Sequence, residues 1–252
     1  MKEDQLQSFF QENPRAALGF SGGVDSAYLL WAGIKAGAKI QPYFIKTAFQ
    51  PAFELKDAQK LTSQMGIRLT VLELDILKEN KIAGNPENRC YYCKHALFGR
   101  LKEQAVKDGY HLLLDGTNAS DESADRPGMR AAEELNVRSP LRDCGFTKEE
   151  IRSYSQQAGL FTWNKPAYAC LATRIPAGRE ITAVLLENIE KSEMTLAEMG
   201  FSDFRVRLYG DAARIQLPAA QMAMVVEKRK EIREALACGF SGIFLDLQER
   251  GN

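Results

Sequence analysis

The chain has 252 residues, of which 45% are hydrophobic and 26% are charged, and its 33 basic and 33 acidic side chains leave no formal net charge. This length suits one large domain or a medium-sized domain with a smaller partner, with enough apolar residues for a sizeable core. No overall basic field would attract nucleic acid, so such a partner is disfavoured unless basic residues gather in a local patch.

The N-terminal stretch and the cysteine count bear on the compartment. Residues 1–14 lack the charged start, apolar run and small-residue cleavage site of a signal peptide. No apolar run approaches the ~20 residues that cross a membrane. We therefore expect a cytoplasmic protein with no membrane partner. In a reducing compartment, five cysteines favour thiol chemistry or metal binding over a disulfide framework.

Apolar runs alternate with helical patterns along the first part of the chain. Predicted strands lie at 15–20, 39–47, 68–74, 111–115 and 137–141. Predicted helices lie at 27–32, 54–65, 90–107 and 148–158. This alternation predicts an α/β fold, a parallel sheet with helices on both faces. Ligands bind at the carboxyl ends of such strands, so the loops there should converge on one site. These loops contain Gly22, Thr47, Gly116 and Ser139.

The pattern changes after about Pro176. A helix at 181–199 precedes two strands, 204–209 and 213–217, which the turn at Gly210-Asp211 should join as a hairpin. A helix at 219–237 and a strand at 242–247 complete a predicted small α+β domain. We expect a first domain over 1–160, a hinge carrying Cys170 over 161–176, and the small domain over 177–252.

The segment Ser21-Gly-Gly-Val-Asp-Ser26 lies between a predicted strand and a predicted helix. Glycines allow the backbone to approach phosphate oxygens, to which serine hydroxyls and helix N-terminal amides can donate. Asp25 has the oxygen ligands that Mg²⁺ prefers. A plain turn with Asp25 as a helix cap is the alternative, but the full hexapeptide favours phosphate binding. No Gly-Lys-Ser/Thr follows it, so it is not a Walker loop.

Three cysteines lie in distinctive positions. Cys90 and Cys93 open a predicted helix, where a thiol becomes a better ligand and nucleophile, and Cys170 stands alone. Structural zinc normally takes four protein ligands, which His95 or His111 would have to complete. Three thiolates could instead hold a 4Fe–4S cluster with one open iron. The other two cysteines have no partner motif and are expected to be buried apolar fillers; these are Cys144 and Cys238.

Five segments in collinear order, from about Ala17 to Leu217, together resemble the LarE family of the PP-loop ATP pyrophosphatase superfamily. LarE proteins are ATP-dependent sulfur transferases of nickel-pincer cofactor biosynthesis. The segments are Ser21-Gly-Gly-Val-Asp-Ser26, Asn88-Arg-Cys-Tyr-Tyr-Cys-Lys94, Asp115-Gly-Thr-Asn118, Pro166-Ala-Tyr-Ala-Cys-Leu-Ala-Thr-Arg-Ile-Pro176, and Arg205-Val-Arg207 with Ala213-Arg-Ile215. The resemblance implies an adenine nucleotide alpha-hydrolase-like fold for residues 1–160 and a substrate-binding role for residues 177–252.

The resemblance also implies a reaction. ATP adenylates a carboxylate of a pyridinium dicarboxylate mononucleotide, and sulfur then displaces AMP to leave a thiocarboxylate. Cys170 matches the sulfur-donating position, and Asp25 of the loop is the candidate catalytic and magnesium-binding residue. The implied ATP-binding residues are Ser21, Gly22, Gly23, Asp25, Ser26, Thr47, Gly116 and Thr117. In family members with an added Cys-x-x-Cys, three cysteines hold a 4Fe–4S cluster that carries the sulfide. That form is favoured here, with Cys90, Cys93 and Cys170 as ligands, over sacrifice of the Cys170 sulfur.

A basic strand face is the expected substrate site. Arg205 and Arg207 are two residues apart and share one face of a predicted strand, from which they could bind a phosphate, with Arg214 joining from the paired strand. Glu193, on the preceding helix, is a candidate acid or metal ligand. The alternative is a solvated basic face.

Other functions use the same loop. Amide-forming synthetases need an ammonia source, and tRNA thiolation predicts a basic surface that the zero net charge argues against. A zinc-stabilised nucleotide-binding module without catalysis is a third alternative. We expect a small-molecule substrate, no nucleic-acid partner, and assembly of the chain into a homo-oligomer.

Overall fold

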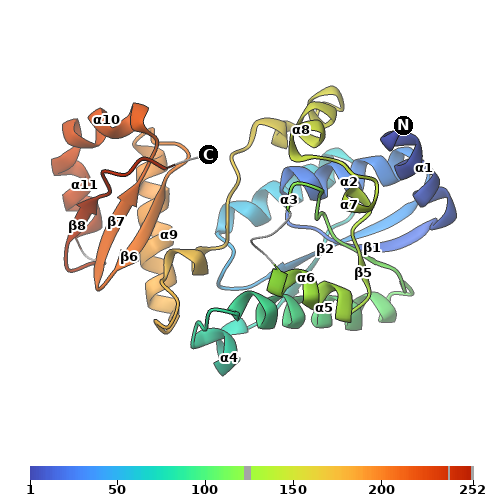
Figure 1. Ribbon diagram of the computed structural model, residues 1–252, viewed down its shortest axis with the longest axis horizontal. Coiled ribbons are helices and arrows are strands. Elements are labelled where there is room, and N and C mark those ends of the chain that lie inside the picture. Colours follow the sequence, from blue (N-terminus) through green and yellow to red (C-terminus); the bar gives the residue numbers. More distant parts are fainter. Residues whose placement is uncertain (122–125, 238, 251–252) are drawn as a thin grey trace. The chain divides into compact units, whose positions relative to one another are not determined.

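The computed structural model describes residues 1–121, 126–237 and 239–250 (Figure 1). The chain divides into two units. Unit 1 comprises Met1–Ile76 and Asn88–Lys165, and unit 2 comprises Leu77–Glu87 and Pro166–Asn252. Within the described residues, no helix has the length and apolar character needed to cross a membrane.

A parallel sheet forms the centre of unit 1. Its described strands run in the order β3-β2-β1-β4-β5, and every neighbouring pair is parallel. The strands are β1 (Arg15–Gly19), β2 (Lys39–Lys46), β3 (Thr70–Glu73), β4 (Leu113–Leu114) and β5 (Val137–Arg138). The predicted α/β fold with a parallel sheet is therefore confirmed.

Helices cover both faces of this sheet (Figure 1). One face carries α1 (Lys2–Glu12), α2 (Val24–Lys35), α3 (Ala52–Gln64), α7 (Pro140–Asp143) and α8 (Lys148–Gln157). The other carries α5 (Arg89–Lys107) and α6 (Arg126–Glu134). The short helix η2 (Phe161–Asn164) ends this unit.

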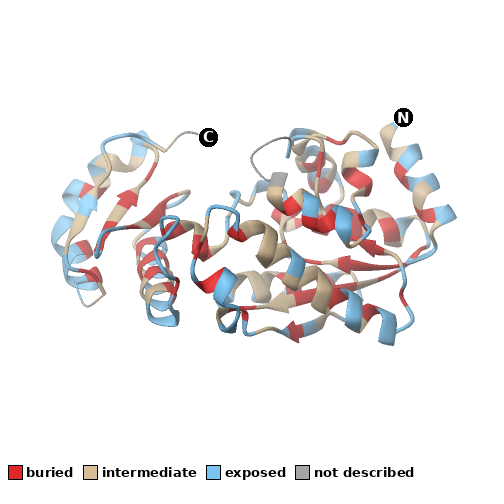
Figure 2. Ribbon diagram, turned by 60° about the horizontal axis from the view of Figure 1, so that its bottom comes forward, coloured by how far each residue is buried: buried red, intermediate tan, exposed pale blue. Residues whose placement is uncertain are grey.

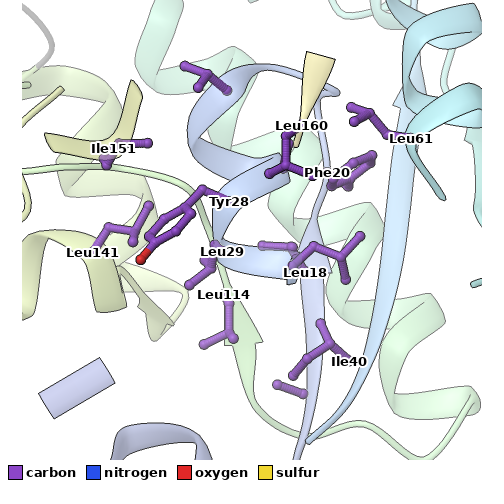
Figure 3. Packing of buried hydrophobic residues seen from close by; sticks show 14 of the residues in the cluster. Leu18, Phe20, Tyr28, Leu29, Ile40, Leu61, Leu114, Leu141, Ile151 and Leu160 are labelled. Atoms are coloured by element: carbon purple, nitrogen blue, oxygen red, sulfur yellow. The ribbon is translucent and has the colours of Figure 1, made fainter. Parts of the chain in front are cut away.

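The side chains of β1 alternate between the two faces of the sheet, so the core of unit 1 has two layers. Leu18 belongs to one buried cluster with Tyr28 and Leu29 of α2 (Figure 3). Its neighbour Ala17 belongs to the opposite cluster, which contains Leu101 of α5. Successive strand residues face opposite sides, so a short apolar strand buries side chains in both layers. Each fully buried side chain of leucine size contributes roughly 1.5–3 kcal/mol of transfer free energy.

Unit 1 differs in detail from expectation. The strand expected over 137–141 ends at Arg138, and α7 begins at Pro140. Proline has no N–H for a strand ladder but is well suited to the first turn of a helix, which explains the change. Helix α1 was not anticipated, although Leu6 and Phe10, four residues apart, are both buried on it.

Unit 2 has a three-stranded sheet in the order β6-β7-β8. Strands β6 (Arg205–Tyr209) and β7 (Ala212–Gln216) form the expected antiparallel hairpin, and β8 (Ile243–Leu245) pairs in parallel with β7. Helix α9 (Ala183–Glu198) precedes the sheet. The helix expected over 219–237 is divided into η4 (Ala219–Gln221), α10 (Met222–Glu227) and α11 (Arg229–Leu236). Buried residues of this unit lie along α9 and the strands (Figure 2), and α10 and α11 also bury Val225, Ile232 and Leu236.

The segment 77–87 belongs to unit 2 although the sequence around it builds unit 1. It contains the end of η1 (Ile76–Lys78) and the short helix α4 (Asn80–Ala83). The amide of Ile181 donates to the Ala83 carbonyl at 2.7 Å, and that of Gly178 donates to the Asn85 carbonyl at 2.8 Å. The buried Asn85 side chain donates to the Pro176 carbonyl at 2.8 Å. Backbone hydrogen bonds therefore tie this segment to the residues before α9.

Candidate active site

The predicted phosphate loop follows β1 at the carboxyl edge of the sheet. Gly22 has φ +73°, and a Cβ on it would lie 3.0 Å from the Ala58 nitrogen of α3. Gly23 is the N-cap of α2, so the loop leads directly into the helix N-terminus. Glycine is required at position 22 by both backbone conformation and space.

Two serine hydroxyls converge at the start of α2. The Oγ atoms of Ser21 and Ser26 are 3.2 Å apart, and the Gly23 amide donates to Ser21 Oγ at 3.3 Å. Ser26 Oγ donates to the Gly23 carbonyl at 3.2 Å. Hydroxyls and helix N-terminal amides thus share one concave turn, which is the arrangement that binds phosphate oxygens.

The loop after β4 packs directly onto this turn. A Cβ on Gly116 would come within 2.9 Å of the Ser26 nitrogen, so only glycine fits. Next to it, the buried Asp115 carboxylate accepts hydrogen bonds from the Thr117 amide at 3.1 Å, the Thr117 hydroxyl at 2.8 Å and the Ser139 hydroxyl at 2.7 Å. The predicted convergence of the loops at residues 22, 116 and 139 is therefore present.

Asp25 lies between two donors from other parts of unit 1. Its Oδ1 accepts from Asn118 Nδ2 at 3.3 Å, and its Oδ2 forms an ion pair with the Lys148 ammonium at the start of α8. Burial raises the pKa of the Asp25 carboxyl, and Lys148 opposes that rise. Sequence reasoning missed Lys148, because it is separated from Asp25 by 123 positions.

Thr47 directly follows β2 and is buried in a tight turn. Its hydroxyl donates to Gln50 Oε1 at 2.6 Å and accepts from the Phe49 amide at 3.0 Å. Lys46 Nζ donates to the Gln50 carbonyl at 2.6 Å, which closes the same turn. Thr47 therefore shapes the loop at the end of β2, the strand next to β1.

Cys90 and Cys93 both lie in the first turns of α5, as predicted, and both are partly exposed thiols. The neighbouring Arg89 is buried, with its guanidinium 5.7 Å from the centre of the Phe49 ring. Arg89 Nη2 donates to Cys90 Sγ at 3.6 Å, whereas Nη1 has no hydrogen-bond partner among the described residues. The start of α5 thus combines two partly exposed thiols with a buried cation.

Cys170 belongs to unit 2 and caps the short helix η3 (Leu171–Arg174). Its carbonyl accepts from the Thr173 amide at 3.0 Å and the Thr173 hydroxyl at 2.8 Å. The thiol is partly exposed. Cys170 is therefore on a hydrogen-bonded turn, whose first carbonyl accepts both bonds from Thr173.

The predicted substrate residues of unit 2 share one sheet face. Arg207 lies opposite Arg214 in the β6–β7 register, and Arg205 is on the same face. Arg205 is buried, and that burial, helped by repulsion from Arg174, lowers its pKa to about 10. Burial also lowers the pKa of Arg207. Glu193 is buried in an ion pair with Arg174, a residue to which the sequence had assigned no role.

Cys144 and Cys238 are the remaining cysteines of the chain. Cys144 is half-buried against the core of unit 1, and burial raises the pKa of its thiol, with the charge of Asp143 adding to the rise. Cys238 lies outside the described residues. Across the part of the chain that is described, no three histidine, cysteine or acidic side chains come together as a ready metal site.

Comparisons with known proteins add to this geometry. No family model matches the chain. The pyridinium-3,5-bisthiocarboxylic acid mononucleotide synthase of Lactiplantibacillus plantarum is 30% identical over 249 residues, which are 98% of this chain and 90% of that protein. An uncharacterized protein of Synechocystis sp. is 38% identical over 229 residues, 90% of this chain and 85% of its own length.

A more distant relative shares part of the chain. The tRNA-specific 2-thiouridylase MnmA of Treponema denticola is 28% identical over 191 residues, 60% of this chain and 52% of that protein. These similarities agree with the parallel sheet and with the Ser-Gly-Gly-Val-Asp-Ser turn, because all three are features expected of a PP-loop protein. The match to the mononucleotide synthase extends over nearly the whole of both proteins, so this chain belongs to the LarE family of the PP-loop superfamily.

Proposed function

We propose that this chain is an ATP-dependent sulfur transferase that converts a carboxylate of a pyridinium dicarboxylate mononucleotide into a thiocarboxylate for a nickel-pincer cofactor. The observation that carries the proposal is the packing of Gly116 against Ser26, with the Asp25 carboxylate held beside it. This builds a phosphate cradle in a chain related over nearly its full length to a bisthiocarboxylic acid mononucleotide synthase.

The first step is adenylation. A substrate carboxylate oxygen attacks the α-phosphorus of ATP, and the bond to the leaving pyrophosphate breaks, which gives an acyl adenylate. Ser21, Gly22, Gly23 and Ser26 bind phosphate oxygens, and Thr47, Gly116 and Thr117 line the nucleotide site. Asp25 supplies the hard oxygen ligands that suit Mg²⁺, which would offset the polyphosphate charge when bound. Adenylation is needed because a carboxylate oxygen is a poor leaving group, whereas AMP leaves readily.

The second step replaces AMP with sulfur. Cys90, Cys93 and Cys170 supply three thiolates, the donors that hold iron–sulfur clusters. Arg89 donates to Cys90 Sγ, a contact that suits a sulfur carrying negative charge. A 4Fe–4S cluster held by these residues would supply the sulfide. That sulfide would add to the acyl carbon as the bond to AMP breaks, which would leave the thiocarboxylate.

The alternative second step uses no cluster. The Cys170 thiolate attacks the acyl carbon and AMP leaves, which forms a thioester. Loss of the Cys170 Cα proton then breaks the Cβ–S bond, so the thiocarboxylate leaves with the sulfur and dehydroalanine remains in the chain. Each protein molecule would therefore donate sulfur only once, because it has a single Cys170.

Metal analysis and mass spectrometry test the proposal. Anaerobically purified protein should contain about four irons and matching sulfide per chain, and Cys170→Ala should release pyrophosphate but transfer no sulfur. Cys144→Ala is the matched control and should retain both steps. Zinc without iron contradicts the cluster, and loss of H₂S from the intact mass after turnover supports the sacrificial step. Sulfur transfer to tRNA instead of the pyridinium mononucleotide would overturn the proposed substrate.

A further inference from the structure

Arginine side chains hold the backbone on both sides of Cys170. Within unit 2, the donors are three arginines and the acceptors are four carbonyl oxygens between residues 167 and 173. Arg205 donates to Ala167, Arg174 to Ala169 at 3.0 Å and to Cys170 at 3.5 Å, and Arg207 to Thr173 at 2.7 Å. Such charge-assisted bonds are stronger than those between neutral groups, so this segment is firmly fixed.

Arg174 is the most deeply buried of the three, with 0% of its side chain exposed. Its Nε donates to Glu193 Oε1 at 2.8 Å and its Nη2 to Glu193 Oε2 at 3.2 Å, which is a bidentate pair. Nη1 also reaches Thr173 Oγ1 at 2.8 Å. One planar guanidinium therefore donates hydrogen bonds both to a carboxylate and to the turn that carries Cys170.

Glu193 connects this pair to the regular structure of unit 2. It projects from α9 and accepts the Val206 amide of β6 at 2.9 Å, as well as the Tyr168 hydroxyl. With the two bonds from Arg174, its oxygens receive four described hydrogen bonds. The Tyr168 ring also packs against Arg174, 4.6 Å from ring centre to guanidinium carbon. The carboxylate is thus engaged in holding protein groups.

We infer that Arg174 and Glu193 are positioning residues for Cys170, which transmit the rigidity of α9 and β6 to the turn that carries the reactive sulfur. The inference rests on the proposed function, in which Cys170 takes part in sulfur transfer. It gives Glu193 a different task from the substrate contact expected from the sequence. A displacement of a reacting atom by about 1 Å can lower a rate by up to ~100-fold. A buried ion pair that fixes the turn of Cys170 would therefore favour the reaction.

The geometry requires arginine at position 174. Lysine carries the same charge but has one compact ammonium, which cannot reach the carboxylate and the carbonyls together. Arg174→Lys should therefore slow sulfur transfer about 10- to 100-fold, whereas pyrophosphate release stays within about twofold. The rate of Cys170 alkylation by iodoacetamide, followed by peptide mass spectrometry, should change at least threefold, while Cys144 in unit 1 reacts as before.

A matched control lies in the same unit. Arg179 donates to Asp211 at 2.8 Å in an exposed ion pair. Arg179→Lys should alter neither sulfur transfer nor Cys170 alkylation. A folded Arg174→Lys protein with unchanged alkylation and unchanged sulfur transfer would overturn the inference.

Glu193→Gln provides the second measurement should Arg174→Lys fail to fold. Glutamine keeps the shape of the side chain and part of its acceptor capacity. A positioning role lowers kcat for sulfur transfer and leaves KM for the mononucleotide unchanged, whereas direct substrate binding raises KM with kcat retained. The second pattern would reject the positioning role.

Alkylation separates this inference from the proposed function. Sulfur transfer that persists in Cys170→Ala would contradict the proposed role of Cys170. The alkylation rates would still report whether Arg174 and Glu193 hold the turn. A changed Cys170 rate in folded Arg174→Lys, or in Glu193→Gln where the first variant does not fold, supports the positioning role whatever chemistry the thiol performs, and an unchanged rate rejects it.

Discussion

Gly116 lies so close to the first turn of α2 that a Cβ atom on it would be 2.9 Å from the Ser26 backbone nitrogen. The loop after β4 and the loop after β1 therefore share one surface, with no room for a side chain between them. Because the carboxyl ends of neighbouring parallel strands meet at one edge, this contact defines the floor of the proposed ATP site.

Gly116→Ala should disturb both loops. The methyl group would force the loop after β4 away from α2, at a cost of about 1–3 kcal/mol in unfolding free energy. Pyrophosphate release should fall at least about tenfold, because the turn proposed to bind phosphate shifts. Gly99→Ala is the control, since Gly99 lies within α5 with nothing within 4 Å of its Cβ position. Equal activity of the two variants would show that the close contact has no role in ATP use.

Asp25→Asn should raise the stability of the protein but lower its activity. Burial raises the pKa of Asp25 above the ordinary 3.8, so the ionised form destabilises the fold at neutral pH. The protonated carboxyl makes its full contribution to the free energy of unfolding below pH 3.8, and this contribution is lost as the pH rises through the raised pKa. The variant should thus be more resistant to urea than the parent at pH 7, and this difference should vanish at the acidic end.

The same variant should lose pyrophosphate release, because the amide cannot provide the carboxylate ligands that we propose for Mg²⁺. Urea unfolding of the protein without nucleotide at several pH values provides the measurement. A variant less stable than its parent at pH 7 would mean that the Lys148 ion pair outweighs the cost of burying Asp25.

Arg205→Ala should weaken binding of the mononucleotide more than binding of ATP. The pKa of Arg205 is lowered only to about 10, so the side chain remains charged at pH 7 and can bind a phosphate. Loss of a charge-assisted hydrogen bond is worth about 1.5–3 kcal/mol, so KM for the mononucleotide should rise roughly 10- to 100-fold. Steady-state kinetics with each substrate varied in turn provides the check. Equal increases in both KM values would point to a general loss of structure.

Glu193→Ala should be strongly destabilising. It leaves the buried Arg174 guanidinium without its counter-charge and the Val206 amide without its acceptor. Breaking a buried ion pair by removing one partner costs about 3–5 kcal/mol. Asp211→Ala breaks the exposed pair with Arg179 and should cost less than about 1 kcal/mol. Chemical denaturation of both variants tests this contrast, and similar losses would contradict it.

The sequence by itself determined the parallel α/β unit and the glycine-containing turn that we propose binds phosphate. Both follow from local signals: apolar runs that alternate with helical patterns, and glycines that the backbone requires. Gly22, with φ +73°, follows a buried strand and precedes a helix. The positions of Cys90 and Cys93 at the start of α5 were predicted for the same reason, because a helix boundary depends on nearby residues.

Only the tertiary structure decided how distant side chains pair. Lys148 meets Asp25 across 123 positions, Arg174 meets Glu193 between a turn and a helix, and segment 77–87 joins unit 2. Hydrophobic periodicity records which face of an element is buried, but it carries no information about which charged group lies opposite. That choice depends on how the elements pack, so the surroundings of Asp25 and Cys170 became visible only in the folded chain.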